Sequence, residues 1–419
     1  MEEKSSGKKK KTRTSNPPAE ASMPAAAAVA SHLTDDIIVE ILSRLPAKSV
    51  HRFKCVSPSW RDLIADPAHR KKLPHTLLGF FYNTYGYSRV DPRSRRFHFA
   101  NVSVGAAPSV DVDPSLPFLP QDKYLYVAQL DTCNGLLLCL GCIAPSSSVL
   151  APEYVVESHY IVCNPATKRW VHLPPLPEVP PGAVFARLAF DPAVSSHFYV
   201  LQFDETEQEE STAGVTIYSS QTGAWKHRKS SFAACSGVTS VFFHGMLHLL
   251  AWLHPLKTAL HVVLVAVDME GRVRDTIPLP SGGMSFYTIG LSQGCLHFAT
   301  TPLTCVERNK KGKKHDDTSL PCKTAQVWYM KDYNTREWVL KHSFSKDELR
   351  TETGVEYKVA AIHPHCDTIF LDSRDADTLA SYDTRQRKLR HILYLEKNKL
   401  ALFVPYVPLF SDSFAGTDG

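Results

Sequence analysis

The sequence predicts an α+β multidomain protein in which a small all-α unit precedes an all-β propeller. Apolar residues recur at helical spacing from Leu33 onward, and prolines interrupt this pattern at short intervals. From residue 96, short β-branched and aromatic runs alternate with Gly, Pro, Asn and Asp, which is typical of many short strands. A hairpin signal returns about every 50 residues, a period that favours the blades of a propeller.

The composition is that of an ordinary globular chain. The 419 residues are 43% hydrophobic and 21% charged, and the net charge is +5. Much of that charge lies in the first 30 residues, so the rest lacks the basic balance of a nucleic-acid-binding domain. Histidines, Pro255 and Lys257 interrupt the most apolar stretch, 241–267, so it does not resemble a membrane span. We expect neither nucleic acid nor a membrane as a partner.

The cysteines and the N-terminal tail indicate where the chain works. Ten scattered cysteines lack the framework of a secreted, disulfide-rich fold, so we expect an intracellular protein. Residues 1–30 have no periodicity and are expected to be a disordered tail. A basic run in it predicts nuclear import, with a merely solvated tail as the alternative, so we expect the nucleus and/or the cytoplasm. This run comprises Lys8, Lys9, Lys10, Lys11 and Arg13.

The first helix is predicted to begin near Leu33. Thr34 can cap it, and the helix dipole favours Asp35 and Asp36 in its first turn. Pro46 ends it, because a proline disfavours helical geometry in the residue before it. The apolar residues at helical spacing are Leu33, Ile37, Ile38, Ile41, Leu42 and Leu45.

Two shorter helical pieces follow. Residues 47–56 are predicted to direct Val50, Phe53 and Val56 inward. Ser57-Pro58 starts a third piece as N-cap and first helical residue. Its inward residues are predicted to be Trp60, Leu63 and Ile64. A unit of about 40 residues buries a low fraction of its surface, so these apolar faces need a partner.

Turn signals organise the second half of the chain. Asn134-Gly135 predicts a type I′ hairpin turn, because both central residues need positive φ. The phrase Gly-x-Leu-His recurs at 245–248 and 294–297. A small polar turn residue with a large apolar residue shortly after it also recurs: Asn164 with Trp170, Ser219 with Trp225, Asp268 with Val273, Asp332 with Trp338, and Asp383 with Leu389.

This spacing favours kelch-like blades, which bury their faces only against their neighbours. Residues 96–410 give room for about six blades. A ring of seven blades, or an imperfect ring, stays open at this point. The repeat position of Trp170, Trp225 and Trp338 favours packing within the blades over a ligand pocket.

Several phrases mark the helical unit: Leu33, Glu40-Ile41-Leu42-Ser43-Arg44-Leu45-Pro46, Phe53-Lys54-Cys55-Val56 and Ser59-Trp60-Arg61. Together they resemble an F-box, the module that docks on the Skp-type adaptor of cullin-RING ubiquitin ligases. Thr34 stands where that family usually has proline, but a capping threonine can start the same helix. The alternative is an internal helical hairpin. The resemblance implies that the adaptor is bound through Leu33, Ile38, Ile41, Leu42, Leu45, Pro46, Val50, Phe53, Val56 and Trp60.

Three phrases mark the second half: Cys133-Asn134-Gly135-Leu136-Leu137, Asn164-Pro165-Ala166-Thr167-Lys168-Arg169-Trp170, and Gly245-Met246-Leu247-His248 with Trp252. They resemble the F-box-associated domain of a large plant family, and the likeness is firmest before residue 255. We divide the chain into a basic, Ala-rich tail (1–30), an F-box (31–75), a linker (76–95), an F-box-associated kelch-like β-propeller (96–410) and a second tail (411–419).

No catalytic, cofactor-binding or metal-binding residues are predicted. Cys139-x-x-Cys142 has no second pair nearby, whereas zinc prefers four ligands. The cluster His363-Pro364-His365-Cys366 is better explained as a repeated turn, because residues 361–364 parallel residues 189–192. An acidic run at 204–210 and a basic cluster at 308–314 are interpreted as solvated loops, with partner choice as the alternative.

The resemblance implies a substrate-recognition subunit of an SCF-type ubiquitin ligase that is not itself an enzyme. Its partners would be the Skp-type adaptor, a cullin-RING complex and an unidentified target protein. The alternatives are a non-degradative F-box scaffold and a propeller enzyme or carbohydrate binder.

Overall fold

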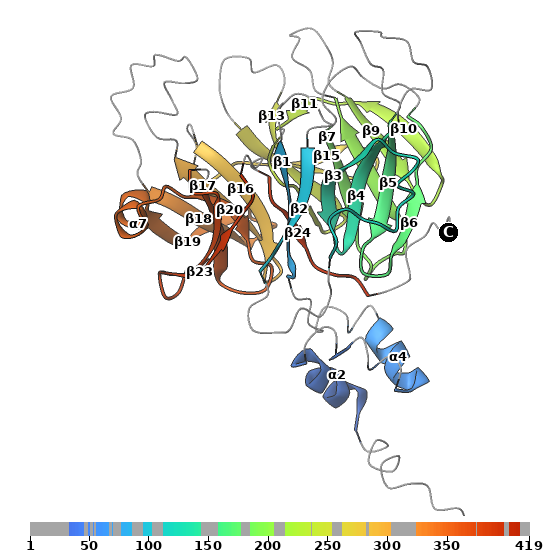
Figure 1. Ribbon diagram of the computed structural model, residues 1–419, viewed down its shortest axis with the longest axis horizontal. Coiled ribbons are helices and arrows are strands. Elements are labelled where there is room, and N and C mark those ends of the chain that lie inside the picture. The colour runs from blue at the N-terminus through green and yellow to red at the C-terminus, as the bar shows by residue number, and fades with distance from the viewer. Residues whose placement is uncertain are drawn as a thin grey trace, which may run out of the picture.

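The computed structural model describes two regions of very different size (Figure 1). The described residues are 33–45, 49–50, 53, 56–66, 69, 77–85, 95–102, 112–143, 158–176, 185–204, 214–235, 237–253, 262–281, 285–302, 324–373, 375–397 and 402–410. Both predicted tails, most of the acidic run, the basic cluster at 308–314 and Pro46 lie outside this set.

In the small region the structure gives bounds for the helices α2 (Asp35–Ser43) and α4 (Pro58–Ala65). Ser57 caps α4 as predicted, since its side-chain oxygen accepts a hydrogen bond from the Trp60 backbone N–H at 3.2 Å. Thr34 is the residue before α2, but its side chain makes no capping hydrogen bond. The helices share a core of their own, formed by Ile38, Val39, Leu42, Val50, Leu63 and Ile64.

The large region is a six-bladed β-propeller, because the described strands pair into six sheets arranged as a ring. Blade 1 contains β3 (Tyr126–Cys133), β4 (Leu136–Cys142), β5 (Ser158–Asn164) and β6 (Arg169–His172). Blade 2 contains β7 (Phe185–Phe190), β8 (Phe198–Phe203), β9 (Gly214–Ser219) and β10 (Ala224–Lys229). Blade 3 contains β11 (Phe232–Ala234), β12 (Val241–Phe243), β13 (Met246–Leu253), β14 (Val262–Val267) and β15 (Val273–Ile277).

The remaining three blades complete the ring. Blade 4 contains β16 (Ser285–Ser292), β17 (Cys295–Pro302), β18 (Thr324–Asp332) and β19 (Glu337–Ser345), and helix α7 (Lys346–Thr353) follows it. Blade 5 contains β20 (Lys358–Ile362), β21 (Thr368–Ser373), β22 (Thr378–Asp383) and β23 (Lys388–Tyr394). Blade 6 combines β1 (Gly79–Tyr85) and β2 (Arg95–Asn101) with β24 (Val404–Tyr406).

Blade 6 closes the ring by joining the two ends of the propeller. The C-terminal strand β24 pairs with the N-terminal strand β1, and Phe81 lies opposite Val404. The chain beyond β24 then crosses blade 1, where the Asn164 side-chain amide donates a hydrogen bond to the Leu409 carbonyl at 2.8 Å. Thr132 also donates its hydroxyl hydrogen to the Pro405 carbonyl. The first and last strands are therefore fixed to one another and to blade 1.

The hydrophobic core is divided among the spaces between neighbouring blades. One buried cluster joins blades 1 and 2, and others join blades 2 and 3, 3 and 4, 4 and 5, 5 and 6, and 6 and 1. Inner strands such as β3 and β7, or β16 and β20, lie in contact, whereas the outer strands β10 and β23 are largely exposed. Each blade is therefore supported by the blades beside it.

The predicted hairpins are confirmed as the repeated turns of the blades. Three turns have two successive residues with positive φ: Asn134-Gly135 between β3 and β4, His244-Gly245 between β12 and β13, and Gln293-Gly294 between β16 and β17. The turn residues Asn164, Ser219, Asp268, Asp332 and Asp383 each stand at the hairpin between the two outer strands of their blade.

The tryptophans of these hairpins pack in the propeller, as predicted. Trp225 of blade 2 donates its indole N–H to the Pro174 carbonyl, which follows blade 1, at 2.8 Å. Trp338 of blade 4 makes the equivalent bond to the Pro278 carbonyl, which follows blade 3, at 3.0 Å. Trp170 packs against the core between blades 6 and 1. Each indole therefore contributes to the contact with the preceding blade.

The Cys139/Cys142 pair and the cluster His363–Cys366 both belong to the framework of the propeller. Cys139 and Cys142 are buried on β4 and form no disulfide with a described residue, and burial raises the pKa of the Cys139 thiol. The segment around His363 forms the turn between β20 and β21, and the segment around Asp191 forms the equivalent turn between β7 and β8. The interpretation of the histidine cluster as a repeated turn is confirmed.

Candidate functional site

Helix α2 has two apolar faces, and the helical core covers only one of them. Ile38 and Leu42 face inward and are almost completely buried. Ile37 and Ile41 stand four residues apart, so they form a stripe along α2, and Leu33, just before the N-cap Thr34, continues the same spacing. The exposed fractions of Leu33, Ile37 and Ile41 are 38%, 47% and 44%. A helix of nine residues therefore presents a second hydrophobic stripe to its surroundings.

The other predicted adaptor residues divide in the same way. Val50 is buried, while Leu45, Phe53 and Trp60 pack on the edge of the core. The rings of Phe53 and Trp60 lie 5.3 Å apart, which fixes the second helical piece against α4. Val56 is 60% exposed. Pro46 lies outside the described residues.

The structure therefore separates the predicted set into residues that build the unit and residues that are available to a partner. Ile38, Leu42 and Val50 belong to the first group, whereas Leu33, Ile41 and Val56 belong to the second. Ile37 was missing from the predicted set, although it is the most exposed member of the stripe. The four-residue spacing from Leu33 to Ile37 to Ile41 was the signal that could have identified it.

Charged side chains border the stripe. Glu40 and Arg44, one helical turn apart, form an exposed ion pair at 2.5 Å. Asp35 and Asp36 lie in the first turn of α2, where the helix dipole favours carboxylates. An apolar centre with a charged rim is the usual anatomy of a protein–protein interface.

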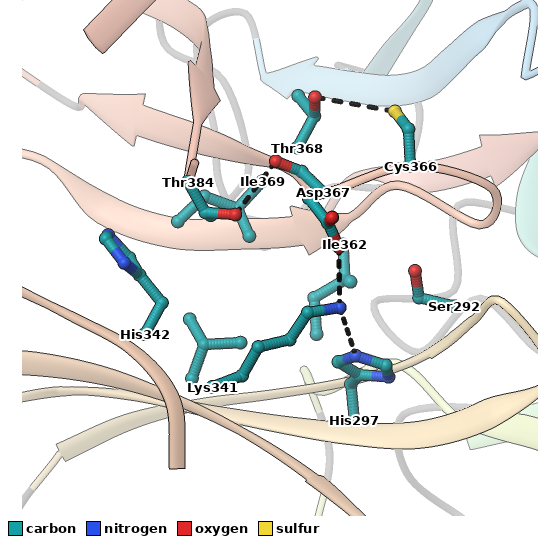
Figure 2. A pocket seen from close by; sticks show the side chains of 11 residues that line it. Ser292, His297, Lys341, His342, Ile362, Cys366, Asp367, Thr368, Ile369 and Thr384 are labelled. Atoms are coloured by element: carbon teal, nitrogen blue, oxygen red, sulfur yellow. Dashed lines mark hydrogen bonds and ion pairs between the residues drawn. The ribbon is translucent and has the colours of Figure 1, made fainter. Parts of the chain in front are cut away.

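The propeller contains a pocket between blades 4 and 5 (Figure 2). It has about 230 Å³ of empty space, including the part open to solvent. The lining residues are Ser292, His297, Val327, Lys341, His342, Ile362, Cys366, Asp367, Thr368, Ile369 and Thr384.

A comparison of neighbouring blades explains this pocket. Between blades 3 and 4, Tyr333 follows the turn residue Asp332, and its hydroxyl lies 2.7 Å from His248 Nε2. The equivalent residue of blade 5 is Thr384, which follows Asp383 and has no ring to fill that space. The pocket is therefore the place where a threonine replaces a packed tyrosine.

The charges in the pocket balance one another. Lys341 Nζ lies 2.8 Å from Asp367 Oδ1 and 3.1 Å from His297 Nε2. Burial lowers the pKa of His297 to about 4, so the ring is neutral and accepts a hydrogen bond from the Lys341 ammonium. The hydrogen bond from Lys341 lowers the pKa of Asp367. The arrangement links blades 4 and 5 through an ion pair.

The described residues give two further observations. Among them, no three His, Cys, Asp or Glu side chains stand close enough together to hold a metal ion. No helix in the described part of the chain is long and apolar enough to cross a membrane.

These features define a protein of two modules, a helical unit with an uncovered apolar stripe and a closed β-propeller. The F-box domain family matches residues 30–72. The family described as "F-box protein At3g26010-like, beta-propeller" matches residues 116–402, which is more than half of the chain. The chain belongs to this family of F-box proteins with a β-propeller.

Individual relatives agree with this family. F-box protein At5g07610 of Arabidopsis thaliana is 30% identical over 205 residues, which are 46% of this chain and 44% of that protein. F-box protein At5g49610 of the same plant is 28% identical over 363 residues, which are 80% of this chain and 83% of that protein. The alignment with the first relative thus covers less than half of its length.

Among solved structures, the β-propeller domain of Myceliophteria thermophila Cps50 (Swd1) is 12% identical, with a TM-score of 0.34. The match covers 65% of this chain and 73% of that one. This likeness is too low to carry an argument.

Proposed function

We propose that this chain is the substrate-recognition subunit of an SCF-type ubiquitin ligase. Its F-box would bind a Skp-type adaptor, and through it a cullin-RING complex, while the propeller captures a target protein. The observation that carries this proposal is the uncovered stripe of Leu33, Ile37 and Ile41 on a helical unit that already has its own core. Such a stripe is typical of a helix that completes its burial against another protein.

The energetics support a role for the stripe as the centre of the interface. Complete burial of an Ile or Leu side chain contributes about 1.5–3 kcal/mol relative to full exposure, and these side chains are already more than half buried. Three of them would therefore contribute about 2–4 kcal/mol in total, which does not by itself exceed the cost of association of about 4–15 kcal/mol. The adaptor must also contact neighbouring surface, where Val56 lies exposed.

A charge placed in the stripe tests the adaptor contact. The full-length variant I37E/I41E is expected to lose at least about tenfold in affinity for a purified Skp-type adaptor, because two carboxylates would be desolvated in the interface. Its thermal unfolding midpoint should stay close to that of the wild type, because neither residue belongs to the helical core.

The matched control for this experiment is V194E, which adds a charge at an 81% exposed valine of the propeller. This variant should bind the adaptor as the wild type does. Undiminished adaptor binding by I37E/I41E would show that the stripe is not the contact.

Target capture requires a second measurement. The receptor would act by raising the local concentration of the target near the ubiquitin-carrying enzyme, without catalysing the transfer itself. Proteins that co-purify only when the proteasome is inhibited are candidate targets. The half-life of a target should fall when the wild type is expressed and rise when I37E/I41E is expressed, since that variant still binds the target. If both proteins bind it and neither changes its half-life, a non-degradative scaffold is the better description.

We also infer that the chain works in the nucleus and/or the cytoplasm, with the run Lys8–Lys11 and Arg13 acting in import. The observation is the density of basic residues in a segment of low apolar content. Replacing these five residues with Gln is expected to move a fluorescent fusion toward the cytoplasm. An unchanged distribution by microscopy would instead favour a solvated tail.

A further inference from the structure

The outer edge of blade 2 differs in its charges from the edges of other blades. Strand β10 reads Ala224, Trp225, Lys226, His227, Arg228 and Lys229, and every residue except Trp225 is exposed. Among the described strands it pairs only with β9, so no described strand lies beside the backbone N–H and C=O groups along its outer side. Figure 1 shows β10 at the rim of the propeller.

The cations of β10 have no ion-pair partner among the described residues. None of the described ion pairs includes Lys226, Arg228 or Lys229. By contrast, Arg274 of β15 pairs with Asp268 at 2.6 Å and Arg390 of β23 pairs with Asp383 at 3.0 Å. Charged side chains, lysines especially, protect an edge strand against pairing with other chains. Three cations without a described carboxylate partner also give this edge a positive charge that favours an acidic partner.

The strand is also held rigidly in place. Trp225 anchors its first residue through the hydrogen bond to Pro174 and packs against Tyr218, with ring centroids 5.2 Å apart. His227 Nδ1 lies 3.0 Å from Thr216 Oγ1 on β9. Binding to a strand that is already fixed in its bound conformation costs less conformational entropy than binding to a flexible one.

We propose that β10 is a docking edge for an extended acidic segment of a partner protein. The segment would add a strand to blade 2, with its backbone hydrogen-bonded to the outer side of β10 and its carboxylates placed beside Lys226 and Arg228, which share one face of the strand. Lys229, on the other face, would add to the positive charge of the edge. Charge complementarity selects an acidic peptide, and the free strand edge selects an extended one. This surface belongs to the propeller and does not depend on the adaptor contact proposed above.

Fluorescence anisotropy with the full chain tests this proposal. The probe is a labelled peptide of alternating Glu and Val, about eight residues long, which is enough to span the six residues of β10. The peptide is expected to bind, and its affinity should weaken as salt rises from about 50 to 300 mM. The variant K226E/R228E/K229E should bind it at least about tenfold more weakly.

Two controls separate the edge from nonspecific attraction. The variant K388E/R390E makes a comparable change on β23, where Arg390 already has a partner, and should change the affinity less than about twofold. A peptide of alternating Glu and Pro has the same charge but lacks half of the backbone N–H groups, and it should bind at least about fivefold more weakly. Equal affinity for the two peptides, or equal loss in the two variants, would overturn the proposal.

Two further measurements test the class of partner and the independence of the surface. A single-stranded oligonucleotide of the same charge should bind more weakly than the Glu-Val peptide, and tighter binding would overturn the choice of an acidic peptide. The chain's own glutamates at 205, 207, 209 and 210 are replaced with Gln in another variant, which should bind the peptide equally or more tightly. Adaptor binding by K226E/R228E/K229E should be unchanged, so failure of this proposal and failure of the adaptor contact are distinguishable.

Discussion

Asp131 and Arg187 are opposite charges buried on the neighbouring inner strands β3 and β7. The Asp131 carboxylate accepts a hydrogen bond from the Leu188 backbone N–H at 2.9 Å. Arg187 donates to the Val238 carbonyl at 2.6 Å, and its guanidinium lies 4.1 Å from the centre of the Phe185 ring. These two side chains therefore connect three consecutive blades. Burying charged groups is costly unless they are paired and hydrogen-bonded.

The free-energy cost of burying the ionised Asp131 carboxylate should be visible in how the unfolding free energy depends on pH. Burial raises the pKa of this carboxyl to about 6, although nearby Arg187 opposes the shift. Because the folded-state pKa lies above the unfolded one, the stabilising effect of the proton is complete below about pH 4 and is lost as pH rises through about 6. The difference in unfolding free energy between D131N and the wild type should therefore shift by about 2 kcal/mol in favour of D131N between pH 4 and 7. Urea titrations at several pH values measure it, and a difference independent of pH would contradict this assignment.

Among the secondary-structure elements, the hairpin turns were predictable from the sequence because positive φ leaves few residue types to choose from. Asn134-Gly135 is an example, and the Ser57-Pro58 start of α4 follows equally from local chemistry. The inner face of α2 was not predictable. Two stripes with four-residue spacing run along this helix, and only the tertiary contacts decide that Ile38 and Leu42 form the core while Ile37 and Ile41 stay exposed.

Some strand pairings and side-chain contacts depend on parts of the chain that are distant in sequence, so the spacing of apolar residues could not predict them. The inner edge of blade 3 is split into β11 and β12, and both pair with β13. Thr34 has the chemistry of a cap, yet its side chain makes no capping bond. The unusual charge of β10 could be recognised only by comparison with the outer strands β15 and β23, where Arg274 and Arg390 form ion pairs. The kelch-like character of the blades stays a prediction.

Two glycines at equivalent turn positions allow a matched test of close packing. Gly135 has a φ of 89°, and an added Cβ would overlap the Leu409 side chain and lie 2.6 Å from its backbone nitrogen. Gly245 has a φ of 73°, and an added Cβ would meet nothing within 4 Å. G245A should cost about 1 kcal/mol from backbone strain alone. G135A should cost about 1–3 kcal/mol more, because it also displaces the C-terminal segment.

Chemical denaturation of both variants checks this comparison. The wild type and the two alanine variants are measured under identical conditions. Equal destabilisation by G135A and G245A would mean that Leu409 does not pack on the turn in solution.

At the scale of the whole molecule, stability depends on the C-terminal segment 402–410. Phe403 is buried in the core between blades 5 and 6, Tyr406 in the core between blades 6 and 1, and Leu409 in the core between blades 1 and 2. Loss of a buried aromatic side chain typically costs about 3–5 kcal/mol, and this segment contributes Phe403 and Tyr406. Three of the six inter-blade cores are therefore incomplete without the segment 402–410.

A chain that ends at residue 401 should lose the cooperative thermal transition of the propeller, because blade 6 would lack its inner strand. A chain that ends at residue 410 is the control and should keep the transition. Differential scanning calorimetry measures both proteins. An unchanged transition in the shorter chain would show that the ring is stable without β24.

Joining both termini in one blade also sets an order of events during synthesis. The F-box is translated first, and its helices have a core that needs no later residue. The ring can close only after β24 has left the ribosome, because β24 supplies the inner strand of the blade that β1 began. If the proposed function holds, a nascent chain would offer its F-box helices to the adaptor well before its propeller could hold a target. Only chains translated almost to the end would then link the two activities, so premature termination would produce competitors for the adaptor that recruit no target.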